Sequence, residues 1–322
     1  MIKSHANQPT LSIVIPIYRE GSHLEVLLSR IMDILVPTKE SFELILVDDG
    51  SPDNTWKIIE KESKKYPMLR ALKLSRNFGK ESAISAGLKV ANGNAVVVMD
   101  GDLQHPPELI PEMLKLWRGS KADVIEAVKV KRSKESFFNK IGARLFYASL
   151  KRLSGYDLTN LTDFKLMDSR VVKAWLQMGE RNLFFRGMSA WLGFEHLKIP
   201  FEVPGRASGK STMSISRLVR LALTAITSFS SLPLHLVTIA GVMFFLFSIF
   251  LAAQTIYMKL SGFAVSGFTT VILLQLIIGS LLMITLGIVG EYIARIYEEV
   301  KRRPRYVIAQ TIDRNYNISK NT

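Results

Sequence analysis

The sequence Ala95-Val-Val-Val-Met-Asp100-Gly-Asp102-Leu-Gln104-His-Pro-Pro107 decides the fold of this chain. Its valine-rich beginning predicts a buried strand, and two carboxylates one residue apart follow at the carboxyl end of that strand. In an open α/β sheet, ligands bind at this end of the strands. Asp100, Asp102 and Gln104 offer hard oxygen ligands that suit Mg²⁺ or Mn²⁺ holding a diphosphate; the alternative is a solvated turn.

Three earlier segments repeat the order of strand, polar turn and helix. We expect strands over residues 11–18, 42–48 and 69–75, with helices over about 23–35, from 55, and up to about 90. This alternation predicts a parallel sheet with right-handed crossovers. Polar residues from several strand ends would then meet at one edge of the sheet: Tyr18, Arg19, Glu20, Asp48, Asp49, Ser75, Arg76, Asn77, Asp100 and Asp102.

The middle of the chain continues with further strands and two amphipathic helices. We expect strands over 123–128, 161–167 and 197–203, and helices over 137–153 and 215–229 whose apolar faces meet the core or a lipid surface. Residues 129–132 and 206–212 are basic loops.

Two long runs without Asp, Glu, Lys or Arg follow Arg220 and are separated only by Lys259. Each run exceeds the roughly 20 residues that a bilayer crossing needs, so we expect spans over 232–257 and 267–290. A buried core hairpin is the alternative, and the length of the runs disfavours it. Basic residues flank both outer ends of this pair, which places the large N-terminal domain in the cytoplasm.

The composition agrees with a membrane-bound protein that handles phosphates. The chain of 322 residues carries a net charge of +14 and contains no cysteine. Positive charge attracts anionic lipids and phosphate-bearing substrates. Nucleic acid is the competing partner, but no segment interleaves aromatic and basic residues as nucleic-acid recognition requires, and we expect no nucleic-acid binding. Disulfides and thiolate metal sites are excluded.

These patterns divide the chain into four expected parts. An α/β domain covers residues 1–212, an interfacial amphipathic helix covers 213–231, a two-helix transmembrane hairpin covers 232–297, and a basic cytoplasmic tail covers 298–322.

Five motifs carry a resemblance to a known family. They are Val14-Ile-Pro-Ile-Tyr-Arg-Glu20, Val47-Asp-Asp-Gly-Ser-Pro-Asp-Asn-Thr55, Ser75-Arg-Asn-Phe-Gly-Lys80, Met99-Asp-Gly-Asp-Leu-Gln-His-Pro-Pro107 and Gly290-Glu-Tyr-Ile-Ala-Arg-Ile-Tyr297. Over about residues 11–306 the chain resembles the family 2 glycosyltransferases, and within them the polyisoprenyl-phosphate glycosyltransferases such as dolichol-phosphate mannosyltransferase. The two C-terminal spans look most like the bactoprenol glucosyltransferase branch.

The resemblance implies a GT-A fold, a nucleotide-sugar donor and a divalent metal, Mg²⁺ or Mn²⁺. It assigns donor binding to Pro16, Tyr18, Glu20, Asp48, Asp49, Arg76, Lys80 and Asp100. It assigns the metal to Asp100, Asp102 and Gln104, and catalysis to Asp102, Asp163 and Lys129. Asp163 would position the acceptor or a basic neighbour, or take up a proton; its structural alternative is a strand-edge carboxylate paired with Lys165. His105 would either reach the phosphates or fix its turn.

The chain departs from the family pattern on the acceptor side. Lys129 stands where an arginine is usual, which keeps the charge but not the bidentate fork. Thr212 stands where a lysine is expected. We therefore expect the acceptor phosphate to bind Lys129, Arg132, Arg206 and Lys210.

The expected reaction is the inverting transfer of a hexose from a nucleotide sugar to undecaprenyl phosphate on the cytoplasmic face of a bacterial inner membrane, for lipopolysaccharide, O-antigen or another envelope glycan. UDP-glucose is the first choice of donor, ahead of UDP-galactose, GDP-mannose and modified UDP-sugars. A flippase and a second glycosyltransferase would act downstream, and the family suggests assembly of copies through the membrane part. The alternatives are a membrane-anchored nucleotide-sugar sensor or flippase scaffold, and a processive polysaccharide synthase, whose Gln-x-x-Arg-Trp-like motif and further spans we do not find.

Overall fold

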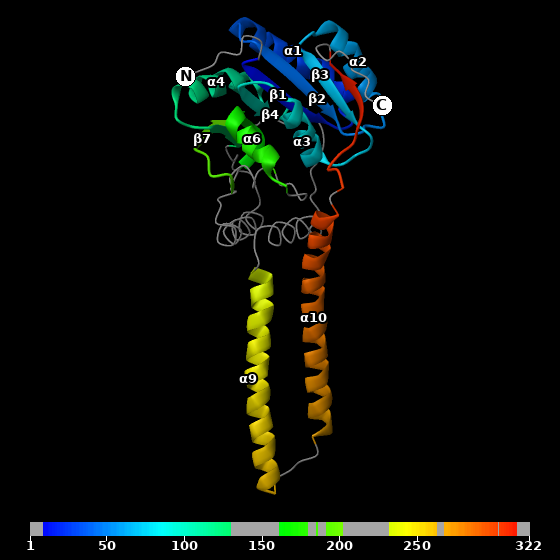
Figure 1. The fold of residues 1–322 in the computed structure, drawn as a ribbon, viewed down its shortest axis with the longest axis vertical. Helices are drawn as coiled ribbons and strands as arrows, with labels where there is room; N and C mark the ends of the chain where they lie inside the picture. The colour runs from blue at the N-terminus through cyan, green and yellow to red at the C-terminus, as the bar shows by residue number, and fades with distance from the viewer. Residues whose placement is uncertain are drawn as a thin grey trace, which may run out of the picture. The chain divides into compact units, whose positions relative to one another are not determined.

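The computed structural model describes residues 9–129, 161–179, 185, 191–201, 232–262, 267–301 and 303–313. Its contacts divide the chain into two compact units. The first unit contains Met1–Tyr147, Tyr156–Ser211 and Arg303–Thr322, and the second contains Ala148–Gly155 and Thr212–Arg302. Figure 1 shows a sheet with helices in the first unit and two long helices in the second.

The first unit is built on one eight-stranded sheet among the described residues, with the order β7-β5-β6-β4-β1-β2-β3-β8. The strands are β1 Leu11–Ile17, β2 Phe42–Asp48, β3 Leu69–Leu74, β4 Ala95–Val98, β5 Val124–Lys129, β6 Leu161–Asp168, β7 His196–Phe201 and β8 Ile308–Ile312. The pairs β1–β2, β1–β4 and β2–β3 are parallel, which confirms the arrangement predicted for the first half of the chain.

The other strands make the sheet mixed. β5 and β7 are parallel, but β6 runs antiparallel to both β4 and β5. Because β6 is antiparallel to β4, its beginning lies at the same edge of the sheet as the end of β4. This places Asp163, the third residue of β6, at the edge where the carboxylates of the 95–107 stretch lie. β6 is also an interior strand, so the alternative in which Asp163 is a strand-edge carboxylate does not hold.

Helices cover both faces of the sheet. The side chains of α1 Gly21–Leu35, α2 Thr55–Lys65 and α4 Ile110–Gly119 pack on one face, and those of α3 Lys80–Val90 and α6 Ser169–Gln177 pack on the other. Short 3₁₀ helices cover Val36–Thr38 and Pro107–Leu109. On α3, a Cβ on Gly87 would lie 2.3 Å from Val14 Cγ1, so this glycine allows close packing of the helix against the sheet.

The segment after the last long helix contains strand β8, which the sequence patterns did not predict. β8 pairs antiparallel with β3 and closes that edge of the sheet. The Ser75 backbone N–H donates to the Val307 carbonyl at 2.9 Å, and Arg70 pairs with Asp313 at 2.8 Å. The C-terminal segment therefore contacts the loop that follows β3.

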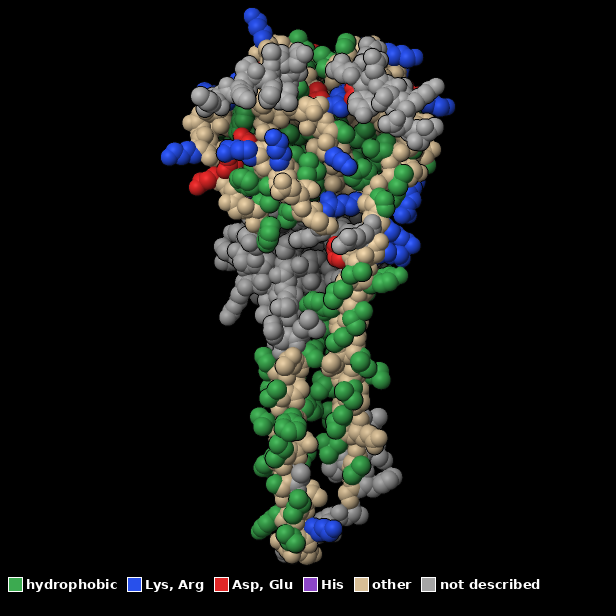
Figure 2. All heavy atoms as spheres, viewed as in Figure 1, with side chains coloured by type: hydrophobic (Ala, Val, Ile, Leu, Met, Phe, Trp, Pro, Cys, Tyr) green, Lys and Arg blue, Asp and Glu red, His purple; other side chains and the backbone are tan. Residues whose placement is uncertain are grey.

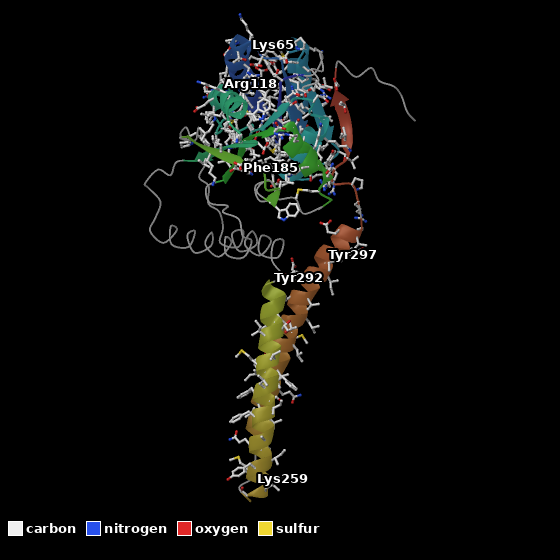
Figure 3. All side chains as sticks on the ribbon, turned by 60° about the vertical axis from the view of Figure 1, so that its left-hand side comes forward. Lys65, Arg118, Phe185, Lys259, Tyr292 and Tyr297 are labelled. Atoms are coloured by element: carbon white, nitrogen blue, oxygen red, sulfur yellow. The ribbon has the colours of Figure 1, made fainter. Side chains whose placement is uncertain are left out.

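The second unit consists, in its described part, of α9 Leu232–Leu260 and α10 Phe268–Val300. Both are long and apolar enough to span a membrane, and their candidate span windows are not buried. Figure 2 shows hydrophobic side chains along both helices. Phe245 on α9 is 66% exposed. Figure 3 labels Lys259 at one end of this helix pair and Tyr292 and Tyr297 toward the other. The predicted interfacial helices at 137–153 and 215–229 lie outside the described residues.

A charged cluster lies inside the first unit. Lys165 and Glu126 are 0% and 3% exposed at their side chains, and Lys165 Nζ lies 2.9 Å from Glu126 Oε1. His196 Nδ1 lies 3.3 Å from the same oxygen. Burial would raise the pKa of Glu126, but the His196 hydrogen bond and the Lys165 charge lower that pKa to about 2.

Replacing Glu126 with glutamine should destabilise the first unit, because the buried ion pair between Lys165 and Glu126 would be broken. We expect Glu126→Gln to cost about 3–5 kcal/mol of the free energy of unfolding. The double variant Glu126→Gln/Lys165→Met should recover most of this loss, since both charges are then removed. Thermal unfolding of the full chain in detergent measures both effects, and a double variant no more stable than Glu126→Gln would contradict the explanation.

The same cluster predicts how stability depends on acidity. The folded-state pKa of about 2 lies below the ordinary 4.5, so the ionised Glu126 stabilises the fold above pH 4.5. This contribution should be lost as the pH falls from 4.5 towards 2. The difference in the midpoint temperature of unfolding between the natural chain and Glu126→Gln should therefore become smaller as the pH falls from 5 to 3. A difference that stayed constant would contradict an ionised Glu126 in the folded protein.

Candidate functional site

A cleft of about 330 Å³ lies at the carboxyl ends of β1, β2 and β4. The loops that follow these strands, together with the start of α3, supply its walls. The residues that line it are Pro16, Ile17, Tyr18, Glu20, Asp49, Asn77, Gly79, Lys80, Asp100, Gly101 and Asp102. Among these lining residues Lys80 is the sole cation.

Hydrogen bonds between neighbouring loops hold the walls of the cleft. Arg19 N–H donates to Ser51 Oγ at 3.0 Å, and Gly21 N–H donates to Thr55 Oγ1 at 3.1 Å. Arg19 has a φ of 58°, an uncommon conformation for a residue with a side chain. The loop after β1 is therefore fixed to the loop after β2, and Tyr18 and Glu20 are placed on either side of a strained residue.

Asp49 ties the loop after β2 to the loop after β3. Its carboxylate accepts hydrogen bonds from the backbone N–H groups of Phe78 at 2.7 Å and Gly79 at 2.9 Å. Gly50, with a φ of 66°, lets the Arg76 backbone approach, because a Cβ there would lie 2.4 Å from the Arg76 carbonyl carbon. Burial raises the pKa of Asp49, and these hydrogen bonds oppose the shift.

The turn after β4 presents Asp100 and Asp102. His105 is 2% exposed, stacks on Phe164 with ring centroids 5.2 Å apart, and accepts a hydrogen bond from Asp100 N–H at its Nδ1 (3.0 Å). The structure therefore favours the alternative in which His105 fixes the turn. Leu103 has a φ of 62°, a strained conformation that costs about 1–3 kcal/mol and that tends to occur at functional sites.

Glu20 reaches across the cleft to this turn. A Cβ on Gly101 would lie 2.2 Å from Glu20 Oε2, so Gly101 makes room for the Glu20 carboxyl. That oxygen is buried and has no hydrogen-bond partner among the described residues. Burial, followed by the charges of Asp102 and Asp100, raises the pKa of Glu20 to about 8, and Lys80 opposes the shift. The cleft is therefore rich in carboxyl groups and poor in positive charge.

Lys80 provides the positive charge inside the cleft. Its Nζ lies 2.5 Å from Asp100 Oδ1 and 2.5 Å from Asp163 Oδ2. Burial would lower the pKa of Lys80, but the charges of Asp100 and Asp163 raise it, so the side chain stays an ammonium. Asp163 thus pairs with Lys80, while Lys165 pairs with Glu126.

The donor atoms in the cleft fit a divalent ion that is shared with a substrate. Within the described part of the chain, no group of three or more His, Cys, Asp or Glu side chains is gathered closely enough to hold a metal by itself. Mg²⁺, however, commonly binds through one or two carboxylates plus substrate phosphates. Asp100 and Asp102 supply two such carboxylates, and the unpartnered Glu20 oxygen beside them is a further hard oxygen atom.

Most of the residues predicted for the donor and metal lie together. Pro16, Tyr18, Glu20, Asp49, Lys80, Asp100 and Asp102 line the cleft, and Asp163 contacts it through Lys80.

Three predicted residues lie beside the cleft without lining it. Asp48 is fully buried and accepts the Ser51 N–H at 2.9 Å, Arg76 lies over the Phe78 ring, and Gln104 N–H donates to Asp102 Oδ1. Their roles stay predictions.

The acceptor side lies largely outside the described residues. Lys129 ends β5, and the structure describes its backbone but not its side chain, whereas Arg132, Arg206 and Lys210 fall outside the described residues. The cleft also contains Ile17, Gly79 and Gly101, which were not predicted as site residues, and Asn77, which was expected at this edge of the sheet without an assigned role. Asn77, Gly79 and Gly101 lie inside the quoted motifs, so the polar side chain and the two glycines in those motifs could have indicated that they belong to the site.

Comparison with known proteins identifies the family. The family model described as glycosyl transferase family 2 matches residues 12–176. The chain is 39% identical over 301 residues to the uncharacterized glycosyltransferase sll0501 of Synechocystis sp., covering 93% of this chain and 94% of the relative.

Two further relatives extend over nearly the whole chain. The uncharacterized glycosyltransferase YkcC of Bacillus subtilis is 36% identical over 302 residues, which cover 93% of each protein. The bactoprenol glucosyl transferase of Shigella phage SfII is 33% identical over 306 residues, covering 94% of this chain and 98% of the relative. With its mostly parallel, GT-A-like sheet and a carboxylate-lined cleft at the strand ends, the chain belongs to glycosyltransferase family 2 and is a glycosyltransferase.

Proposed function

We propose that this protein transfers a hexose, with UDP-glucose as the first-choice donor, to a polyprenyl phosphate such as undecaprenyl phosphate at the cytoplasmic face of the membrane. The main support for the proposal is that Asp100 and Asp102 line one cleft together with Lys80 and Glu20. Relatives named bactoprenol glucosyl transferase and the two apolar helices support a lipid-borne acceptor. UDP-galactose, GDP-mannose and modified UDP-sugars remain the alternative donors.

Different residues of the cleft would bind different parts of the donor. Tyr18, Glu20 and Asp49 would contact the nucleoside, because they line the wall formed by the loops after β1 and β2. Asp100 and Asp102 would hold a divalent ion, which when bound neutralises charge on the departing diphosphate. Glu20 Oε2 is a buried acceptor that a hydroxyl or N–H donor of the donor molecule could satisfy.

The acceptor needs little help to react. A phosphate monoester has a second pKa of about 6, so at neutral pH it is already largely an anion and requires little general-base catalysis. Its oxygen would attack the anomeric carbon from the face opposite the nucleoside diphosphate, forming a bond from phosphate oxygen to carbon as the bond to the diphosphate breaks. This inverts the anomeric centre. Asp163 then acts by positioning, because its carboxylate holds Lys80.

The proposal predicts that Asp102→Asn removes transfer without removing the fold. The substitution keeps the size of the side chain but removes one negative charge from the cleft. Loss of several kcal/mol of charge stabilisation should lower the rate by at least about a hundredfold. The measurement mixes purified full chain, Mn²⁺, undecaprenyl phosphate and labelled UDP-glucose, UDP-galactose or GDP-mannose, and counts label in extracted lipid.

Asp33→Asn is the matched control, because Asp33 is exposed on α1 and does not line the cleft. Its rate should equal that of the natural chain. Transfer from one donor would also name the sugar. If no donor gave labelled lipid, the proposed reaction would be wrong and a nucleotide-sugar sensor would account for the cleft. If Asp102→Asn transferred sugar at the natural rate, the assigned role of the metal would be wrong.

Gly50→Ala should weaken donor binding because it displaces the loop after β3. The new Cβ would lie 2.4 Å from the Arg76 carbonyl carbon, and the φ of 66° is strained for alanine. The backbone N–H groups that bind Asp49 would move with that loop. We expect UDP affinity in the presence of Mn²⁺ to fall at least about tenfold, equivalent to about 1.4 kcal/mol.

Gly119→Ala is the control for this substitution. A Cβ there meets nothing within 4 Å, and Gly119 ends α4 away from the cleft. Calorimetric titration of UDP into both variants should show loss of affinity only in Gly50→Ala. Equal affinities would contradict the positioning of the cleft by the Gly50–Arg76 contact.

A further inference from the structure

Lys80 occupies an unusual position for a residue expected to bind the donor. Its ammonium is not directed at open space but lies 2.5 Å from one oxygen of Asp100 and 2.5 Å from one oxygen of Asp163. The Asp163 side chain is 5% exposed, that of Asp100 is 24% exposed, and that of Lys80 is 39% exposed. Asp163 is thus a buried anchor, while Asp100 faces the cleft.

Asp100 therefore has two competing uses. Under the proposed function its carboxylate binds a divalent ion, at the roughly 2.1 Å that Mg²⁺ requires. A doubly charged ion at that oxygen would lie within a few ångströms of the Lys80 ammonium, where two cations repel each other strongly because the cleft is partly shielded from water. Lys80 and the metal therefore compete for Asp100.

The Lys80 side chain has an alternative anionic partner in the diphosphate of the donor. It is a point charge on a flexible four-carbon stem, and it belongs to the first turn of α3, beside the Asn77 and Gly79 lining of the same cleft. Lys80 is the sole cation among the lining residues, so an incoming diphosphate would meet its positive charge there. Asp163 can keep Lys80 at the cleft during this exchange.

We propose that Lys80 is a built-in competitor of the divalent ion: it neutralises Asp100 in the free protein and moves to the donor's diphosphate when metal and nucleotide bind together. This inference rests on the proposed metal and nucleotide site and adds an order to its assembly. Without nucleotide, the metal must displace the Lys80 ammonium from Asp100, and the ammonium gains no new anionic partner in return. With the diphosphate present, the displaced ammonium gains a partner. Metal and nucleotide therefore bind cooperatively, and each raises the affinity of the other by the same factor.

The test measures Mn²⁺ binding directly, from the electron paramagnetic resonance signal of free aqueous Mn²⁺ titrated with purified full chain. Lys80→Met removes the competing charge while keeping an unbranched side chain. A cation beside a carboxylate typically lowers its proton affinity at least about tenfold, and we expect a similar effect on Mn²⁺, so Lys80→Met should bind Mn²⁺ alone about tenfold more tightly. Lys80→Arg keeps the charge and should bind Mn²⁺ alone like the natural chain.

A second titration measures the coupling. UDP should raise the Mn²⁺ affinity of the natural chain, after correction for Mn²⁺–UDP binding in solution, and this gain should be smaller in Lys80→Met. Lys80→Met breaks the ion pair between Lys80 and the buried Asp163, which could destabilise the fold. The double variant Lys80→Met/Asp163→Asn removes both charges and therefore serves as a variant that should keep its fold. It should also bind Mn²⁺ alone more tightly than the natural chain.

The outcomes separate this inference from the proposed function. If Lys80→Met and the double variant bind Mn²⁺ alone no more tightly than the natural chain, or not at all, Lys80 is not a competitor and the inference is wrong. If they bind it more tightly while the natural chain transfers sugar to no polyprenyl phosphate, the competition stands and the proposed reaction is wrong.

Discussion

Repulsion between carboxyl groups at one edge of the sheet is the constraint on which the site depends. Parallel pairing of β1, β2 and β4 brings the residues that follow these strands together, so Glu20, Asp49, Asp100 and Asp102 share one cleft. The raised pKa of Glu20, about 8, is a direct consequence of burial beside the two aspartates. A fold that tolerates this arrangement must supply positive charge, and within the cleft Lys80 is the residue that does so.

The first half of the chain could be predicted from the sequence because its signals are local. Apolar runs define β1, β2 and β4, and leucines and alanine define β3. Polar turns end these strands, and the alternation with helices predicts parallel pairing. The position of Asp100 and Asp102 follows from the end of β4 alone. In this half the structure differs only in detail, since α1 begins at Gly21 rather than His23. In the second unit, α9 continues to Leu260 and includes Lys259, beyond the expected end at residue 257.

The remainder depends on contacts between residues far apart in the chain. β8 was missed because its five residues are mostly exposed, have no apolar alternation, and become a strand only by pairing with β3 more than 230 residues earlier. The Lys80–Asp163 pair was equally out of reach, because it requires β6 to run antiparallel beside β4. Sequence reasoning identified each of these two residues and expected Asp163 to position the acceptor or a basic neighbour, with pairing to Lys165 as the structural alternative, but it could not name Lys80 as the partner.

The antiparallel pairing of β6 explains why a transferase cleft would contain its own ammonium. Val98 pairs with Lys165, so continuing the register by two residues brings Asp163 opposite Asp100, and a cation between them offsets the repulsion of two neighbouring carboxylates. In this chain α3 delivers it, with Lys80 Nζ 2.5 Å from each carboxylate. Lys80 thus lies between the buried Asp163 and Asp100, which lines the cleft. Under the proposed exchange of partners, the cleft would accept metal and diphosphate without an excess of either sign of charge.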